Sequence, residues 1–98
     1  EVYGWFGVFS KNATQKTITV PGGSTAAGTQ LQLWQYSGTD WQKVSISPQL
    51  NGTYKFNFKN DGMSWDVGGG SMGNNANINQ YPNTANAWQS FKIERVHE

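Results

Sequence analysis

The chain has 98 residues, enough for one small domain with a modest core, and it contains no cysteine that could form a disulfide bond. No run of residues is long and apolar enough to predict a membrane-spanning segment. Seven basic and six acidic residues nearly cancel, and no basic stripe is visible, which argues against a site for the phosphate backbone of nucleic acid. We therefore expect neither a nucleic-acid partner nor insertion into a membrane.

Short β-strands are predicted along the whole chain, because apolar and polar side chains alternate with a period of two. Clusters of Gly, Asn, Asp and Pro separate these segments and are typical of turns. No window has the period of an amphipathic helix of useful length. The fold class is therefore expected to be all-β. The predicted strands span residues 3–9, 16–20, 30–34, 43–46, 53–58, 64–67, 77–81 and 89–96.

Two copies of one unit follow each other along the chain, offset by 47 residues. No gap is needed between residues 18–46 and their partners, and a fixed period of this kind is typical of repeat architectures. The matched pairs include Phe9 with Phe56, Val20 with Val67, Gly22 and Gly23 with Gly69 and Gly70, Leu31 with Ile78, Trp34 with Tyr81, Gln42 with Gln89, and Ile46 with Ile93. We divide the single domain, residues 1–98, into unit one (3–50) and unit two (51–96).

The composition indicates a surface suited to a neutral, polar partner. Charged residues are few, amide side chains are many, and 14% of the residues are aromatic. Asn and Gln each offer a donor and an acceptor on one planar group, and aromatic faces offer weakly polar platforms. A sugar is a neutral partner rich in hydroxyl groups. Amide-rich sequences are also common in secreted β proteins that bind no sugar, so composition by itself leaves both interpretations open.

Units of about this length, each ending in a Gln-x-aromatic signature, resemble the repeats of ricin B-type lectins, which are β-trefoil carbohydrate-binding modules. The resemblance rests on the glycine turn VGGGSMGNNANINQY, the run GTQLQLW and the twin segments WQKVSI and WQSFKI, and it covers essentially the whole chain. Val44 and Phe91 stand where the family pattern has tryptophan, and a tryptophan instead precedes each glutamine. The resemblance implies β-trefoil-type repeats, each of four strands.

The glutamines of the pattern, Gln42 and Gln89, are expected by this resemblance to be structural residues whose side chains satisfy backbone groups near the core. Direct contact with a ligand is the less favoured alternative, and Gln89 stays among the candidate sugar-binding residues. Trp41 and Trp88 fit either a lid on the core or an exposed platform. The apolar residues expected in the core are Val44, Ile46, Phe91 and Ile93.

Family sites, by the same resemblance, use an acid on the second strand of a repeat, with an amide and an aromatic residue two positions apart on the third. A carboxylate accepts hydrogen bonds from two adjacent sugar hydroxyls, and an aromatic ring covers the apolar C–H face of a pyranose. Residues two positions apart on a strand share one face. The matching residues of unit two are Asp66, Asn79 and Tyr81, with the backbone of Gly69 close by.

Two features weaken the match to the family site. In unit two, Trp88 stands where another Asn or Asp often precedes the glutamine, so Asn83 or Asn86 in the adjoining loop is a candidate replacement. In unit one, Gln32 and Trp34 match the amide and the ring, but Thr19 stands in the place of the acid. A hydroxyl cannot accept two charge-assisted hydrogen bonds. We therefore expect a weak or degenerate site in unit one.

A β-trefoil has three repeats, whereas two are visible here, and an open barrel would expose strand edges and core surface. Three explanations fit the sequence. Other copies of the chain complete the barrel as a homo-oligomer, for which a trimer or a dimer is expected. Alternatively, the chain is part of a longer module. Finally, the fold is a different two-unit β protein, such as a pair of Greek keys of the βγ-crystallin type.

Catalysis is not expected, because the six acids form no recognisable pair for glycoside hydrolysis and the single histidine, His97, lies beside the C-terminus. No metal site and no cofactor are expected. The predicted function is non-catalytic binding of mono- or oligosaccharides and glycoconjugates, with galactose-type sugars first by resemblance and xylose polymers second. The alternative is a β-trefoil interaction scaffold or protease inhibitor that binds no sugar. The resemblance also implies a secreted, extracellular protein.

Overall fold

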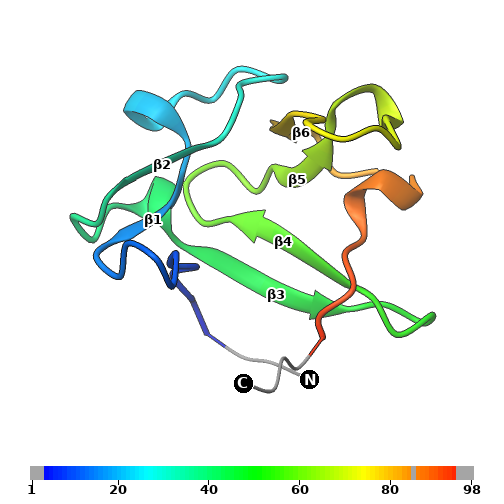
Figure 1. Cartoon of the computed structure of the whole chain (residues 1–98), viewed down its shortest axis with the longest axis horizontal. Helices are drawn as coiled ribbons and strands as arrows, with labels where there is room; N and C mark the ends of the chain where they lie inside the picture. Colours follow the sequence, from blue (N-terminus) through cyan, green and yellow to red (C-terminus); the bar gives the residue numbers. More distant parts are fainter. Residues whose placement is uncertain (1–3, 85, 95–98) are drawn as a thin grey trace.

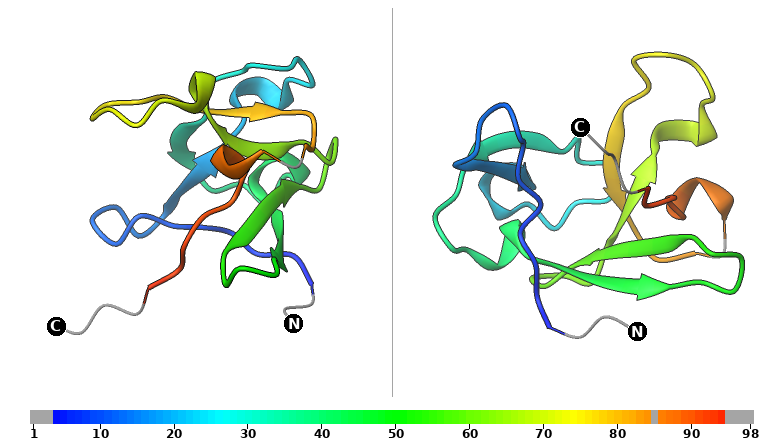
Figure 2. Two further views of the ribbon diagram at one scale, coloured as in Figure 1. Left: turned by 90° about the vertical axis from the view of Figure 1, so that its right-hand side faces the viewer. Right: turned by 60° about the horizontal axis from the view of Figure 1, so that its bottom comes forward.

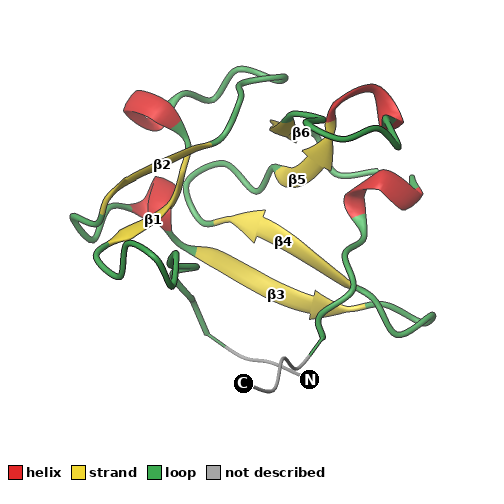
Figure 3. Ribbon diagram, in the orientation of Figure 1, coloured by secondary structure: helices red, strands yellow, loops and turns green. Residues whose placement is uncertain are grey.

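The computed structural model describes residues 4–84 and 86–94, whose strands form two antiparallel sheets (Figure 1; Figure 3). One sheet pairs β1 (Lys16–Thr19) with β2 (Gln32–Gln35). The other follows chain order through β3 (Val44–Pro48), β4 (Tyr54–Phe58), β5 (Ser64–Val67) and β6 (Ile78–Tyr81). Four 3-10 turns are η1 (Pro21–Gly23), η2 (Asp40–Gln42), η3 (Gly68–Gly70) and η4 (Ala87–Gln89). These described residues contain no α-helix, and the predicted all-β class is confirmed.

The core forms where the alternating apolar residues of β3 and β4 face the same side. Val44 lies opposite Phe58 and Ile46 opposite Phe56 in the antiparallel register. The ring of Phe56 stacks on that of Trp65, with centroids 4.4 Å apart. Stacking of two aromatic rings adds to the stabilisation from burial. The buried apolar residues are Val20, Val44, Phe56 and Phe58.

The turns recur at the 47-residue offset that the sequence shows. Turn η3 stands 47 residues after η1, and η4 stands 47 residues after η2. Gly23 and Gly70 both have positive φ, +68° in each case. A Cβ atom on Gly23 would lie 2.9 Å from the ring of Trp41, and one on Gly70 would lie 2.7 Å from the ring of Trp88. Glycine is therefore required at each position for two reasons: the backbone has a positive φ, and a tryptophan ring packs against the residue.

The two units interlock through the segment before β2 and the strand β6 (Figure 1; Figure 2). The N–H of Gly28 donates to the carbonyl of Gln80 (2.8 Å), and the N–H of Gln80 donates to the carbonyl of Thr29 (2.9 Å). The side chain of Gln80 is fully buried and donates to the carbonyls of Ser24 and Ala26, at 2.9 and 3.0 Å. Unit one thus adds backbone partners to the outer edge of unit two's last strand.

The prediction of strands in the segments 3–9 and 89–96 is wrong. In the segment 3–9, only single bridges are formed, by Phe6 with Val44 and by Phe9 with Thr17, and residue 3 lies outside the described residues. In the segment 89–96, Gln89 belongs to η4, Phe91 makes one bridge with Tyr54, and residues 95–96 lie outside the described residues. A strand is stabilised by partners, and each of these segments has a partner along only part of its length.

The prediction that Ile93 belongs to the core is also wrong, because this residue is 53% exposed. Its counterpart Ile46 is half-buried and paired with Phe56, which belongs to the unit that follows. Among the described residues, no strand pairs with Ile93 as β4 pairs with Ile46. Val44 lies in the core as predicted, and the half-buried Ile46 and Phe91 pack against it.

Candidate functional site

A pocket on unit two, called the second pocket below, has a volume of about 380 Å³. It brings together the residues that the sequence predicts for the sugar site of unit two. The antiparallel register of β5 and β6 sets Asp66 directly opposite Asn79, and Tyr81 follows two positions later on the same face. Turn η3 contributes its glycine backbone. The pocket is lined by Gly28, Asp66, Gly68, Gly69, Asn79, Tyr81, Asn86 and Trp88.

The carboxylate of Asp66 is held from one side by Gln89. The Nε2 atom of Gln89 donates to Oδ2 of Asp66 at 2.8 Å. Among the described residues, Oδ1 of Asp66 has no hydrogen-bonding partner. Asp66 is almost fully buried yet lines the pocket. The arrangement fixes the plane of the carboxylate and leaves acceptor capacity for a ligand that donates hydrogen bonds.

Gln89 itself does not line the second pocket. Its side chain is fully buried: Oε1 accepts from the N–H of Thr84 (2.8 Å), and Nε2 also donates to the carbonyl of Pro82 (3.0 Å). The expected structural role of this glutamine is therefore what the geometry shows. Its connection with the pocket runs through Asp66.

Two rings form the open walls of the second pocket. Tyr81 and Trp88 both line it and are both exposed. Trp88 rests against Gly70 rather than in the core, so of the two alternatives for this tryptophan, the exposed platform is the one observed. The side-chain amide of Asn79 has no hydrogen bond to another described residue and is free to act as donor and acceptor.

Sequence reasoning missed two residues of this pocket, Gly28 and Gly68, and left another open. Asn86 lines the pocket, whereas Asn83 instead accepts a long hydrogen bond from Asn57 (3.5 Å). Gly28 was missed because it belongs to unit one and reaches the pocket only through its hydrogen bond with Gln80. Strand alternation places residues within a unit, but it contains no information about contacts between units.

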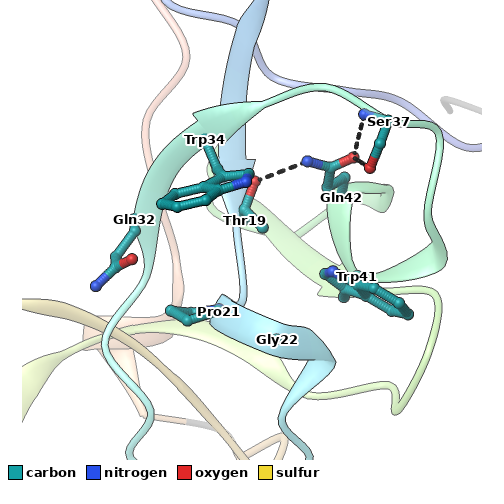
Figure 4. A pocket seen from close by; sticks show the side chains of 8 residues that line it. All are labelled: Thr19, Pro21, Gly22, Gln32, Trp34, Ser37, Trp41 and Gln42. Carbon is teal, nitrogen blue, oxygen red and sulfur yellow. Dashed lines mark hydrogen bonds between the residues drawn. The ribbon is translucent and has the colours of Figure 1, made fainter.

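The first pocket, on unit one, is the counterpart of the second and has a volume of about 400 Å³ (Figure 4). It contains the three predicted residues Thr19, Gln32 and Trp34. Figure 4 shows the rings of Trp34 and Trp41 on either side of Thr19. The full lining is Thr19, Pro21, Gly22, Gln32, Trp34, Ser37, Trp41 and Gln42.

The polar groups at the base of the first pocket are already used within the protein. Oγ1 of Thr19 donates to the carbonyl of Thr17 (2.9 Å) and accepts from Nε2 of Gln42 (3.3 Å). Gln42 is buried, accepts from the N–H of Ser37 and donates to the carbonyl of Gln35, both at 2.8 Å. Gln42 thus repeats the bonding of Gln89, but the group that it holds is a hydroxyl with no charge to offer a ligand.

The described residues also limit other kinds of site. Within residues 4–84 and 86–94, no group of three or more His, Cys, Asp or Glu side chains is placed to hold a metal ion. In the same part of the chain, no helix is long and apolar enough to cross a membrane. His97 lies outside the described residues.

A family model described as ricin-type beta-trefoil lectin domain-like matches residues 5–96. The chain belongs to this family. At the level of the family, this assigns carbohydrate binding and carbohydrate partners, since lectins are proteins that bind sugars. It also confirms the resemblance inferred from the sequence. A comparison with curated proteins found no match.

Solved β-trefoil structures share the fold of the chain. The designed three-fold symmetric protein ThreeFoil aligns with a TM-score of 0.91 and 25% identity, over 95% of this chain and 66% of its own length. An exo-beta-1,3-galactanase from Clostridium thermocellum aligns with a TM-score of 0.84 and 23% identity, over 98% of this chain and 21% of its own. A mosquitocidal holotoxin aligns with a TM-score of 0.82 and 19% identity, over 91% of this chain and 11% of its own. The chain thus spans about two thirds of ThreeFoil.

Proposed function

We propose that this protein is a non-catalytic lectin that binds galactose-type sugars in the second pocket. The observation that supports this most strongly is the carboxylate of Asp66, of which one oxygen is held by Gln89 while the other has no partner among the described residues. A free carboxylate oxygen at the base of an aromatic-walled pocket is suited to a ligand that is uncharged and rich in hydroxyl groups.

The residues around Asp66 divide the recognition of a pyranose between them. Asp66 accepts hydrogen bonds from adjacent hydroxyls, and the free amide of Asn79, directly across the strand pair, adds a directional donor and acceptor. Tyr81 offers a ring for the apolar C–H face of the sugar. No step of this recognition breaks a bond, and binding alone accounts for the roles of all three residues.

Galactose-type sugars rank first for two reasons. The family resemblance implies them, and one of the structures that share the fold belongs to an exo-beta-1,3-galactanase. Xylose polymers rank second. A single open site binds a monosaccharide weakly, so several copies on one particle would gain by multivalency. The predicted homo-oligomer remains a prediction, and light scattering in solution measures it.

The test is a calorimetric titration of the intact chain with galactose, lactose and xylose. We expect binding of galactose and lactose with one site per chain. Asp66→Asn removes the charge while keeping the shape, and loss of a hydrogen bond to a charged group costs about 1.5–3 kcal/mol, which corresponds to roughly 10- to 150-fold in affinity.

The matched control is Asp40→Asn, since Asp40 is an exposed acid whose carboxylate faces Lys59 at 3.7 Å, in an ion pair separate from the lining of the second pocket. This substitution removes the same charge and should leave sugar affinity unchanged. Full retention of binding by Asp66→Asn, with its fold verified by circular dichroism, would remove Asp66 from the site. Absence of binding to all three sugars by the wild-type chain would favour the interaction-scaffold alternative.

A further inference from the structure

Lys55 is a buried cation next to the segment that carries Asn86 into the second pocket. It lies on β4 and is only 9% exposed, whereas lysine is almost never buried without a partner. Its Nζ atom donates a hydrogen bond to the carbonyl of Thr84. Burial of an ammonium group costs free energy unless hydrogen bonds replace its water. The apolar core gives no reason for a charge at this position, so the reason must lie in what Thr84 contacts.

A chain of hydrogen bonds connects this cation to the carboxylate of Asp66. Lys55 donates to the carbonyl of Thr84, and the N–H of Thr84 donates to Oε1 of Gln89 (2.8 Å). Nε2 of Gln89 in turn donates to Oδ2 of Asp66 (2.8 Å). In each bond the donor belongs to the link nearer the cation, and bonds aligned in this way polarise one another. Among the described side chains, no ion pair joins Lys55 to Asp66 directly, so the connection runs through this chain.

The face of β4 that bears Lys55 makes a second contact with the same segment. Asn57 lies two positions after Lys55 and therefore shares its face. Nδ2 of Asn57 donates to Oδ1 of Asn83 (3.5 Å), the residue before Thr84. On the other side, the N–H of Asn86 donates to Oγ1 of Thr84 (3.2 Å). Thr84 is thus bonded both to β4 and to Asn86, which lines the second pocket.

Unit one builds the same turn without a cation. At the offset of 47 residues, Val8 corresponds to Lys55 and Ser37 corresponds to Thr84. The N–H of Ser37 donates to Oε1 of Gln42 (2.8 Å), which repeats the bond that Thr84 makes in unit two. The turn therefore forms with an apolar residue at the position of Lys55. It follows that the shared fold does not require the charge.

The buried acid and the buried cation occur in the same unit. Unit two has Asp66 and Lys55, whereas unit one has Thr19 and Val8 at these positions. Each charge is costly to bury by itself, and an opposite charge linked to it through hydrogen bonds offsets part of that cost. The cation is therefore associated with the acid of the second pocket rather than with the frame that both units share.

We propose that Lys55 is a positioning residue of the sugar site in the second pocket. Through Thr84 it steadies Gln89, which fixes the carboxylate of Asp66 in the orientation that accepts hydrogen bonds from a sugar. Lys55 does not line the pocket, so it acts without touching the ligand. A binding group recognises its ligand fully only when its neighbours hold it closely in place. This inference rests on the function proposed above for the second pocket.

The test repeats the calorimetric titration with galactose, lactose and xylose for Lys55→Met and for Lys55→Val. Methionine keeps most of the length of the side chain without its charge, and valine is the residue that unit one has at this position. We expect both variants to bind galactose about 5-fold more weakly, which corresponds to about 1 kcal/mol, with the number of sites unchanged. The control is Lys16→Met, since Lys16 is an exposed lysine of β1 in unit one. It removes the same charge and should leave the affinity unchanged.

The outcomes of this titration distinguish the role of Lys55 from the function of the pocket. Wild-type affinity in a folded Lys55→Met variant would overturn the inference and leave the proposed lectin function standing. A wild-type chain that binds none of the three sugars would overturn both. An equal loss from Lys16→Met would show that net charge sets the affinity, and failure of both Lys55 variants to fold by circular dichroism would show that the fold requires the cation. Either of these results would also overturn the inference.

Chemical rescue separates the charge of Lys55 from the space that it fills. The chain has no cysteine, so Lys55→Cys introduces a single thiol. Alkylation of the unfolded variant with bromoethylamine, followed by refolding, restores an ammonium group at nearly the original distance from the backbone, whereas propyl bromide adds a neutral group of the same length. The aminoethylated protein should regain the wild-type affinity, and the propylated protein should stay weak. Rescue by both reagents, or by neither in folded proteins, would overturn the role of the charge.

Hydrogen exchange locates the effect along the chain of bonds. In Lys55→Met, the protection of the N–H of Thr84 should fall about 5-fold, because its segment loses a bond to β4 and opens more readily. The N–H of Val44, which donates to the carbonyl of Phe6 (2.9 Å), should keep its protection. Unchanged protection at Thr84 would remove Lys55 from the chain of bonds. An equal loss at Val44 would show that Lys55 stabilises the whole fold rather than the site, and would also overturn the inference.

Discussion

The first and second pockets occupy the same place in their units and are built from the same parts, yet they present different chemistry at their bases. Gln42 and Gln89 hold the same three positions around them, and Trp41 and Trp88 rest on equivalent glycines. At the centre of the first pocket stands Thr19, whose hydroxyl already donates to one group of the protein and accepts from another. At the centre of the second stands Asp66, with acceptor capacity left. The two pockets therefore share the same surrounding residues, and the proposed difference in sugar binding rests on the side chain at this one position.

The largest expected difference between the two pockets is in the free energy of unfolding when Gln42 and Gln89 are each replaced by leucine. Gln89→Leu leaves the carboxylate of Asp66, the N–H of Thr84 and the carbonyl of Pro82 without their partner and should cost about 3 kcal/mol or more. Gln42→Leu leaves a neutral hydroxyl in place of the carboxylate and should cost about 2 kcal/mol. Urea unfolding followed by circular dichroism measures both. Equal losses would mean that the charge of Asp66 does not contribute to the difference.

The next prediction tests whether the two glycine–tryptophan contacts are equally tight. Gly23→Ala and Gly70→Ala should each lower the free energy of unfolding by about 2 kcal/mol, because each places a Cβ against a tryptophan at positive φ. Gly69→Ala is the control, since its φ is +62° but no atom lies within 4 Å of the added Cβ. It should cost about 1 kcal/mol by backbone strain alone. A loss at Gly69 as large as that at Gly70 would show that Trp88 yields to the new methyl group.

A smaller effect separates the pockets in function. Tyr81→Ala should weaken galactose binding by about 2- to 12-fold, the range that corresponds to 0.5–1.5 kcal/mol for an aromatic contact. Trp34→Ala, at the equivalent position of the first pocket, should leave the calorimetric affinity unchanged. A matching loss from Trp34→Ala would mean that the first pocket binds sugar without an acid.

The smallest expected effect is the gain of a weak second sugar site. Thr19→Asp places a carboxylate where Gln42 can hold it, as Gln89 holds Asp66. We expect a second sugar site per chain, with a lower affinity than the site at Asp66. The affinity should be lower because no residue of a neighbouring unit lines the first pocket. Calorimetric stoichiometry measures this, with Thr17→Asp as a control that should add no site and should destabilise a fully buried position. An unchanged stoichiometry in a folded Thr19→Asp variant would show that an acid at this position is not sufficient.

Much of the fold and of the site could be predicted from the sequence, and the reasons are local. The period-two alternation placed all six strands, β1 to β6, to within one or two residues of their observed bounds. The offset of 47 residues aligns Asp66 with Thr19 in the sequence alone. The acid, the amide and the ring then met in one pocket because register and strand period are fixed by hydrogen bonding.

The failures come from contacts between units, which alternation does not encode. The segments around Phe6 and Phe91 alternate as strands do, but each has partners along only part of its length. Ile93 is as apolar as Ile46, yet no described element covers it as β4 covers Ile46. Gly28 was not predicted as a pocket residue because it belongs to unit one and lines the pocket of unit two. Local pattern therefore predicts which face is apolar, but not whether anything packs on it.

The buried side chain of Gln80 has a consequence for the order of folding. Its hydrogen bond to the carbonyl of Ser24 joins residues 56 positions apart, which is more than half of the chain. Contacts of such long range form late, because the intervening segment must first be organised for its ends to meet. The β3–β4 hairpin lies entirely between these two residues and needs no distant contact to begin. The loop that walls the second pocket should accordingly be the last part of the chain to become protected from hydrogen exchange during refolding.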